Sequence, residues 1–174
     1  VDRADVVLLV LDASAGVTNQ DQRLAERVDA AGCAVVVVMN KWDLLDTDQR
    51  LALRAQIADE LPFLAYAPSL KASALSKMGV FRIWPAIDEA LAAHRERVPT
   101  RKLNEVIEAA QAAHPPPSGR ILYATQGATH PPTITLFTNR ELPPHYLRYI
   151  ERKLREAIEF GPAPIKLRVR PRAS

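Results

Sequence analysis

The sequence predicts an α/β protein in two parts, a partial doubly wound parallel sheet followed by a small α-β-β-α-β unit. Three observations carry this prediction. Two short apolar runs, Val6–Leu11 and Ala34–Met39, each precede a segment with helical spacing, which is the βαβ pattern. Apolar and basic residues alternate over Ile165–Arg170, as in a strand with one charged face. Between these regions, Val98-Pro99-Thr100 is typical of a boundary, so we expect domains at residues 1–98 and 99–174.

In the first part, strands and helices are expected to alternate. The two apolar runs suit buried parallel strands, and a third strand is expected at Ser69–Ala72. Apolar residues at helical spacing predict helices over residues 20–31, 48–60 and 80–97. The inward positions expected for the second and third of these helices are Leu51, Leu53, Ile57 and Leu61, and Phe81, Ile83, Trp84, Ile87 and Leu91.

The second part is expected to begin with a helix. Thr100 is the predicted cap of a helix over residues 101–113, and the run His114-Pro115-Pro116-Pro117 ends it. The remaining elements expected are two antiparallel strands over residues 120–126 and 133–139, a helix over residues 144–160 and a strand over residues 165–170.

Charge is shared unevenly between the two parts. The chain has a net charge of +3, but residues 1–99 hold 11 Lys and Arg against 14 Asp and Glu, whereas residues 100–174 hold 12 against 6. A basic second part favours an anionic partner, with RNA first in line. The alternative is a solvated surface that happens to be basic.

Cysteine content and hydropathy limit the compartment. The single cysteine, Cys33, excludes an internal disulfide framework. The apolar runs are far too short to cross a bilayer, and no signal-like stretch is found. These features favour a cytoplasmic protein without a membrane partner.

The most informative motif is Asn40-Lys41-Trp42-Asp43, which follows directly on the second apolar run. Guanine presents two donors on one edge, and an ionised Asp43 carboxylate accepts both as charge-assisted bonds. Adenine would leave that carboxylate unpaired, which is how a site rejects an analogue. The Lys41 stem suits the flat face of the base, with its ammonium in solvent or on a loop carbonyl. The Asn40 amide suits a tie between loop segments.

A second motif, Ser73-Ala74-Leu75, follows the third expected strand. The backbone N–H of Ala74 is a candidate donor to guanine O6. The alternative interpretation of Asn40–Asp43 is an ordinary turn after a strand, since Asn and Asp favour turns. The occurrence of both motifs at this spacing favours the guanine site.

With these motifs and the basic α-β-β-α-β tail in order, the sequence resembles the Der/EngA family of bacterial tandem GTPases. It is similar to the C-terminal part of such a protein: the back half of the second G domain, a P-loop NTPase domain whose N-terminal strands are missing here, and then the KH-like domain. The resemblance covers nearly the whole chain. Further matching stretches are residues 4–13, 17–21, 40–44, 101–104 and 143–149.

The resemblance implies a protein that binds GTP or GDP with Mg²⁺, hydrolyses GTP and acts in assembly of the large ribosomal subunit. It implies that the tail contacts ribosomal RNA or the other G domain of the parent chain. The positions that carry over as contacts to the base are Asn40, Lys41, Asp43, Ser73 and Ala74.

The departures from the family concern the phosphates. No Gly-x-x-x-x-Gly-Lys-Ser/Thr is present. We also expect no Asp-x-x-Gly, so that the residues that hold the metal and order the γ-phosphate are missing. The two switch segments would precede Val1. We therefore expect the chain alone to bind GTP weakly or not at all and not to hydrolyse it, and we assign it no catalytic or metal-binding residue. The tail also lacks the Gly-x-x-Gly loop by which typical KH domains clamp nucleic acid.

Other candidate residues are weaker. Arg168, Arg170 and Arg172 are the expected RNA contacts, although charge protection of an edge strand is an alternative reason for them. Trp42 and Trp84 are expected to be packing residues, and the four histidines lack metal-binding spacing and suit surface or helix-end positions.

Three functional hypotheses stay open. The first is a ribosome-assembly GTPase whose chemistry depends on sequence outside this chain. The second is an RNA- or protein-binding scaffold module in which the guanine loop has no nucleotide function in isolation. The third is a different, single-domain GTPase with an unrelated basic tail.

Overall fold

A computed structural model describes residues 4–172, and these residues divide into two compact units. Unit 1 runs to His94 and includes Gly161–Pro164, whereas unit 2 comprises Arg95–Phe160 and the segment that begins at Ile165. The expected domain boundary between residues 98 and 99 stays a prediction. Within the described range, no helix combines the length and apolar character needed to cross a membrane.

Unit 1 is built on a three-stranded parallel sheet. The strands β1 (Val6–Asp12), β2 (Ala34–Asn40) and β3 (Ser69–Lys71) lie in the order β1-β2-β3. The expected strands are therefore present, with β1 and β2 each one residue longer at the carboxyl end. Asp12 and Asn40 end their strands side by side, because they are partners in the parallel register.

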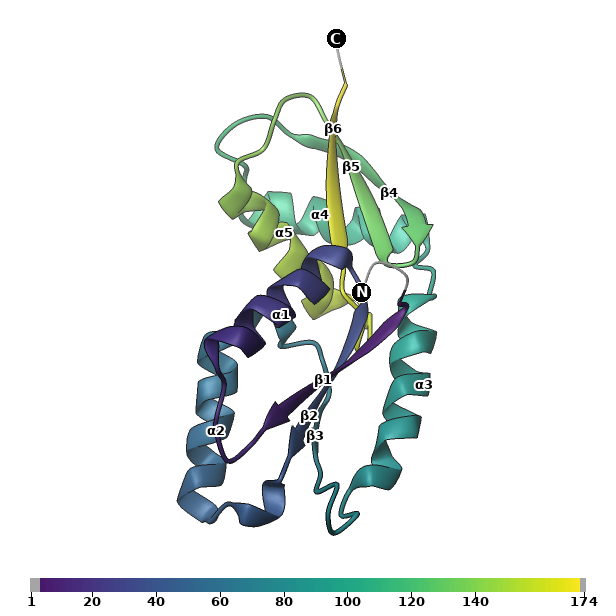
Figure 1. Cartoon of the computed structure of the whole chain (residues 1–174). Helices are drawn as coiled ribbons and strands as arrows, with labels where there is room; N and C mark the ends of the chain where they lie inside the picture. Colours follow the sequence, from purple (N-terminus) through teal and green to yellow (C-terminus); the bar gives the residue numbers. More distant parts are fainter. Residues whose placement is uncertain (1–3, 173–174) are drawn as a thin grey trace. The chain divides into compact units, whose positions relative to one another are not determined.

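Three helices connect and cover these strands. They are α1 (Asn19–Ala31), α2 (Thr47–Glu60) and α3 (Ile83–His94). Thr18 and Asp46 begin the first two helices as N-caps, each in a reciprocal capping box, which satisfies backbone N–H groups that have no partner inside the helix. In Figure 1, α1 and α2 lie beside one face of the sheet and α3 beside the other, which agrees with the two core clusters of this unit.

The strand β2 is buried on both faces from Ala34 to Met39, as a central strand between two helical layers requires. The strand β1 differs from the expected buried run. Leu9 and Leu11 are buried, but Leu8 is 39% and Val10 is 54% exposed. Leu8 and Val10 are exposed because β1 pairs only with β2 in the described part of the chain and because α3 packs mainly over β2.

The apolar face predicted for α3 is wrong at two positions. Phe81 and Trp84 are 72% and 73% exposed. The α-helix begins only at Ile83, after a 3-10 turn, and it ends at His94 rather than at residue 97. Its buried residues are Ala86, Ala90, Ala93 and His94. Small side chains one turn apart let the helix approach β2 closely, so the bulky residues point elsewhere.

One further expectation for a buried side chain in unit 1 is wrong. Leu51 in α2 is 60% exposed, although Leu53 and Leu61 are buried as predicted. His94 has the helix-end position expected of it, but it is buried, and its Nε2 lies 2.9 Å from the carbonyl oxygen of Gly32. Trp42 is a packing residue as predicted.

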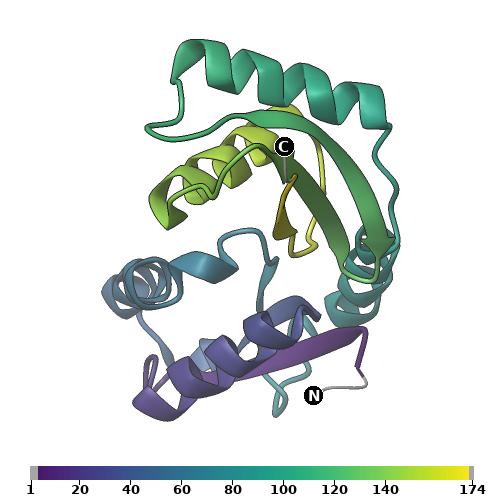
Figure 2. The same cartoon turned by 90° about the horizontal axis from the view of Figure 1, so that it is seen from above.

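Unit 2 has the expected α-β-β-α-β order. Its elements are α4 (Thr100–Ala113), β4 (Ile121–Thr129), β5 (Pro132–Thr138), α5 (Pro144–Ala157) and β6 (Lys166–Pro171). The strands lie in the order β4-β5-β6, with β4 antiparallel and β6 parallel to β5. Figure 2 shows α4 running along the sheet, and one apolar core joins α4, α5 and the sheet.

Three details of unit 2 differ from the sequence prediction. The cap of α4 is Pro99 rather than Thr100, because Thr100 is already helical and no side chain caps this end. The helix α5 ends at Ala157, where Ile158 turns to an extended conformation, instead of continuing to residue 160. The hairpin between β4 and β5 is tighter than expected, because β4 continues to Thr129.

A glycine makes one close approach in unit 1 possible. Gly79 has a φ of +72°, and a Cβ built on it would lie 2.1 Å from the carbonyl oxygen of Lys71. Both the backbone conformation and the space therefore exclude a side chain here. The contact holds the loop after β3 against the strand that it leaves.

We expect Gly79→Ala to lower the free energy of unfolding by about 2 kcal/mol or more, because the chain must shift away from β3. Denaturant-induced unfolding of the full chain, followed by circular dichroism, measures this change. Gly127→Ala is the matched control, since its Cβ would meet only Thr135 Oγ1 at 3.4 Å. An equal loss of stability in both variants would contradict the assigned clash.

Candidate functional site

The candidate site lies where the carboxyl ends of β1, β2 and β3 meet, which is the edge at which open parallel sheets bind ligands. Backbone hydrogen bonds hold the segments that leave these strands. Ala13 N donates to Asn40 O over 2.9 Å, and Trp42 N donates to Ala72 O over 3.1 Å. The loop after each strand is thus fixed to a neighbouring strand end.

Asn40 joins two of these loops through its side chain. Its Oδ1 accepts a hydrogen bond of 2.9 Å from the backbone N–H of Ala74. The tie predicted for Asn40 is confirmed by this bond. It also occupies the Ala74 N–H that was predicted to donate to guanine O6, so a base would share or displace this bond.

Lys41 makes an ion pair that the sequence did not reveal. Its Nζ lies 2.5 Å from Asp12 Oδ2, so the side chain, which is exposed, contacts a carboxylate rather than a loop carbonyl. The backbone N–H and the hydroxyl of Ser14 donate to the other carboxylate oxygen over 3.0 and 2.6 Å. The bond from Lys41, and then that from Ser14, lowers the pKa of Asp12 to about 2. The sequence held one signal for this ion pair. Asp12 directly follows the first apolar run as Asn40 directly follows the second, which places both at the same edge of a parallel sheet.

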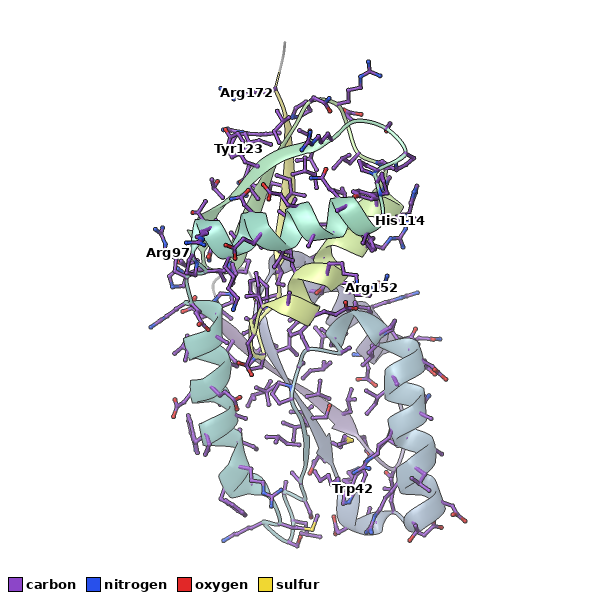
Figure 3. The ribbon with its side chains drawn as sticks, turned by 180° about the vertical axis from the view of Figure 1, so that it is seen from behind. Trp42, Arg97, His114, Tyr123, Arg152 and Arg172 are labelled. Atoms are coloured by element: carbon purple, nitrogen blue, oxygen red, sulfur yellow. The ribbon has the colours of Figure 1, made fainter. Side chains whose placement is uncertain are left out.

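Trp42 anchors the loop so that Asp43 points away from the core. Trp42 is 6% exposed and belongs to the core cluster shared with α1 and α2. Three cationic side chains lie within 6 Å of its ring centroid, namely Arg50, Arg54 and Lys71. Figure 3 shows Trp42 at the end of unit 1 where these loops lie.

Asp43 is exposed, and within residues 4–172 its carboxylate has no hydrogen-bond or ion-pair partner. A carboxylate in this state offers both oxygens to an incoming pair of donors. Guanine recognition by Asp43 requires such a carboxylate, with both oxygens available to the two donors of the base.

Ser73 shapes the neighbouring loop from within. It is 1% exposed, its Oγ accepts from Ser76 N over 3.2 Å, and its own N–H donates to Met78 O over 2.9 Å. The side chain of Ser73 is therefore occupied by the turn, while the backbone of Ala74 lies at the exposed surface of the loop. Leu75, which follows, is 92% exposed.

A hollow of about 410 Å³ in unit 1 adjoins the segment that follows Asp43. It is lined by residues 13–16 after β1, by Leu44 and Leu45, and by residues of α2, and none of the predicted base contacts lines it. Gln56 closes one side, since its side chain bonds both the N–H and the C=O of Val17 over 3.0 and 3.1 Å. The predicted base contacts lie instead on the open edge.

Comparison with known proteins assigns both units. Residues 1–99 match the family described as the elongation factor Tu GTP binding domain. Residues 97–170 match the KH-domain-like family of EngA bacterial GTPase enzymes, C-terminal. The protein named GTPase Der from Mycobacterium avium is 44% identical over 99% of this chain, and those from Synechococcus sp. (strain RCC307) and Crocosphaera subtropica are 42% and 43% identical over 96%.

The chain belongs to the Der/EngA family of bacterial GTPases. It spans 38% of the length of the Mycobacterium avium protein and 39% of the other two. A solved structure of elongation factor SelB from Methanococcus maripaludis aligns with 52% of this chain and 21% of its own, with a TM-score of 0.48 and 23% identity, and it adds nothing to the assignment.

Membership of the Der/EngA family implies Mg²⁺, but the described residues do not fit it. Residues 4–172 contain no group of three or more His, Cys, Asp or Glu side chains that could hold a metal ion. The carboxylate of Asp12 at the strand edge is already paired with Lys41. The letters Asp-x-x-Gly do occur, at Asp29–Gly32, so their expected absence was wrong. They form the end of α1, where Gly32 caps the helix in the left-handed conformation.

In the region that matches the KH-like family, the three expected RNA contacts lie on β6 or just beyond it. Arg168, Arg170 and Arg172 are all exposed. Since β6 pairs with β5 alone among the described strands, it is an edge strand, and charge protection of this edge also fits the arrangement.

The ion pair of Asp12 predicts a pH dependence. A depressed pKa means that the contribution of this group to stability is present above its ordinary value of 3.8 and is lost as the pH falls through about 2. We expect Asp12 to titrate near pH 2 in NMR spectra of its carboxyl carbon. Lys41→Met should move the pKa toward 3.8, although the Ser14 bonds hold it somewhat lower. Lys77→Met is the control and should change nothing; a wild-type value near 3.8 would refute the ion pair.

Proposed function

We propose that this chain supplies the guanine-recognition edge and an RNA-binding unit of a cytoplasmic GTPase that acts in assembly of the large ribosomal subunit. One observation carries the nucleotide part of this proposal. The Asn40 side chain bonds Ala74 N–H across the strand ends, while Asp43 stays exposed and unpaired beside them. The loops are thus preorganised, and the one group that selects the base is available.

Recognition follows from hydrogen-bond chemistry. The ring N–H and the exocyclic amine of guanine donate to the two oxygens of Asp43, which are acceptors only when ionised. The Lys41 side chain is held along the edge by Asp12, so its methylene stem is positioned for the face of the base. Adenine lacks this pair of donors and would leave the carboxylate partly desolvated and unpaired.

The phosphates need groups that this sequence does not contain. Charge-assisted bonds to the phosphates supply much of the affinity for a nucleotide, and no Gly-x-x-x-x-Gly-Lys-Ser/Thr is present. We therefore assign base selection to residues 40–43 and 73–74, and we assign neither hydrolysis nor a metal-dependent step to any residue of this chain.

Asp43→Asn in the complete protein that contains this segment tests the base assignment. An amide offers one acceptor and one donor, so it matches xanthine rather than guanine. We expect GTP affinity to fall about 10- to 100-fold while xanthosine triphosphate gains, since each lost bond is charge-assisted. Displacement of fluorescent GDP measures both.

Asp48→Asn is the matched control, because Asp48 is an exposed carboxylate in the first turn of α2. It should leave both affinities unchanged. If Asp43→Asn shows no drift toward xanthosine triphosphate, the guanine assignment is wrong.

A second function, a scaffold that binds RNA or protein without a nucleotide, is favoured by the basic strand β6 and its exposed arginines. The 174-residue chain on its own distinguishes the contributions. We expect no heat of GTP binding at micromolar concentration in titration calorimetry, and co-sedimentation with purified large ribosomal subunits. Micromolar GTP binding would overturn the assignment of the phosphate site outside this chain, and absence from the ribosomal pellet would count against the proposed partner.

A further inference from the structure

The outer face of the sheet in unit 2 carries an aromatic pair. Tyr123 on β4 and Phe137 on β5 are partners in the antiparallel register. Their ring centroids lie 4.4 Å apart with an interplanar angle of 13°, so the rings are stacked. Both are only partly buried, and neither belongs to the core that Ile134 and Leu136 form with the helices. The stack therefore faces away from α4 and α5.

The register of β6 brings arginines to the same face. Arg170 is the register partner of Phe137, and Arg168 is the register partner of Thr135. Each arginine therefore lies directly beside a residue of β5 that faces outward. Paired residues on adjacent strands about 4.8 Å apart point to the same side of a sheet. Arg172 extends this series, because its N–H donates to Thr138 O over 2.7 Å. Figure 3 shows Tyr123 and Arg172 toward the same end of the sheet.

These arginines have no internal counter-charge. The strands β4, β5 and β6 contain no Asp or Glu. Across the described chain, Arg168, Arg170 and Arg172 make no ion pair with a carboxylate. The charge of these arginines therefore remains available to an anion from outside.

We propose that this face, defined by Tyr123, Phe137, Arg168 and Arg170, binds single-stranded RNA, with a base stacked on the aromatic pair and phosphates held by the arginines. Aromatic rings on a sheet surface bind bases by stacking, and guanidinium groups bind phosphates bidentately. Duplex RNA does not offer its base faces, so the platform suits unpaired nucleotides. This proposal rests on the proposed function in one respect, the identification of the nucleic acid as RNA.

The face therefore has two contributions to RNA affinity that can be measured separately. The arginines supply salt-dependent binding to phosphates, and the aromatic pair supplies salt-independent stacking on a base. An acidic protein would use the arginines alone, and its binding would not require the rings.

The test uses the full 174-residue chain and a fluorescein-labelled oligoadenylate RNA of about ten nucleotides, which is within the site sizes of single-strand binding folds. Fluorescence anisotropy gives the affinity at several salt concentrations. Phe137→Ala should weaken binding about tenfold without changing the salt dependence, because it removes stacking. Arg170→Gln should weaken binding and reduce the slope of log K against log salt by about 0.7, because it removes one phosphate contact.

Three controls make the result specific. Tyr123→Phe keeps the stack and should bind like the wild type. Phe81→Ala removes an exposed aromatic of unit 1 and should also bind like the wild type. An abasic oligonucleotide of equal length should bind the wild type and Phe137→Ala equally, since it has phosphates but no bases. Unfolding midpoints within error of the wild type ensure that each variant is folded.

Two outcomes overturn the proposal. One is no RNA binding by the wild-type chain, and the other is equal RNA affinity for wild type and Phe137→Ala. Co-sedimentation with large ribosomal subunits keeps this failure separate from that of the proposed function. Sedimentation of wild type and Phe137→Ala alike, without binding to the oligonucleotide, would leave the ribosomal partner in place and overturn this face as its RNA-binding surface. Aromatic-dependent RNA binding without sedimentation would support the face and contradict the ribosomal partner.

Discussion

Burial of β2 on both faces is the constraint on which the rest of unit 1 depends. A strand with α1 and α2 on one side and α3 on the other has no freedom to slip, since a one-residue shift would exchange its two buried faces. Asn40 is the first residue at which the strand reaches the surface. Its place at the carboxyl end, in register with Asp12, is therefore set by apolar packing several residues earlier. Apolar packing of β2 thus determines where the polar residues of the edge lie.

Much of this arrangement could be predicted from the sequence, because hydrophobic periodicity and capping residues are local signals. The boundaries of β2 and α2 and the tie made by Asn40 follow from such signals. The wrong predictions concern which of several apolar residues in one helix are buried, and this depends on the packing of the assembled fold. Phe81 and Trp84 had the right spacing for a buried face, but α3 packs through its alanines, because β2 lies too close for large rings.

The ion pair between Lys41 and Asp12 was also missed, although the matching positions of Asp12 and Asn40 after the two apolar runs were visible in the sequence. The two residues are far apart in the chain, and Lys41 already had an adequate local explanation as a stem against the face of the base. Only the parallel register of β1 and β2 brings them together. In unit 2 the same holds for Tyr123, Phe137 and Arg170. They lie in one row because the pairing of β4 with β5 shifts register just before Tyr123 and because β6 adds to β5 in parallel. Pairing between distant strands is the information that a linear pattern lacks.

The position of Trp42 has a practical consequence for spectroscopy. This indole is buried inside the very loop that carries Asn40 and Asp43, with positive side chains close to its ring. The other tryptophan of the chain, Trp84, is solvent-exposed and emits at longer wavelength for that reason. Replacing Trp84 with phenylalanine therefore leaves Trp42 as the single tryptophan, whose emission under selective excitation reports on the loop directly, without any attached dye.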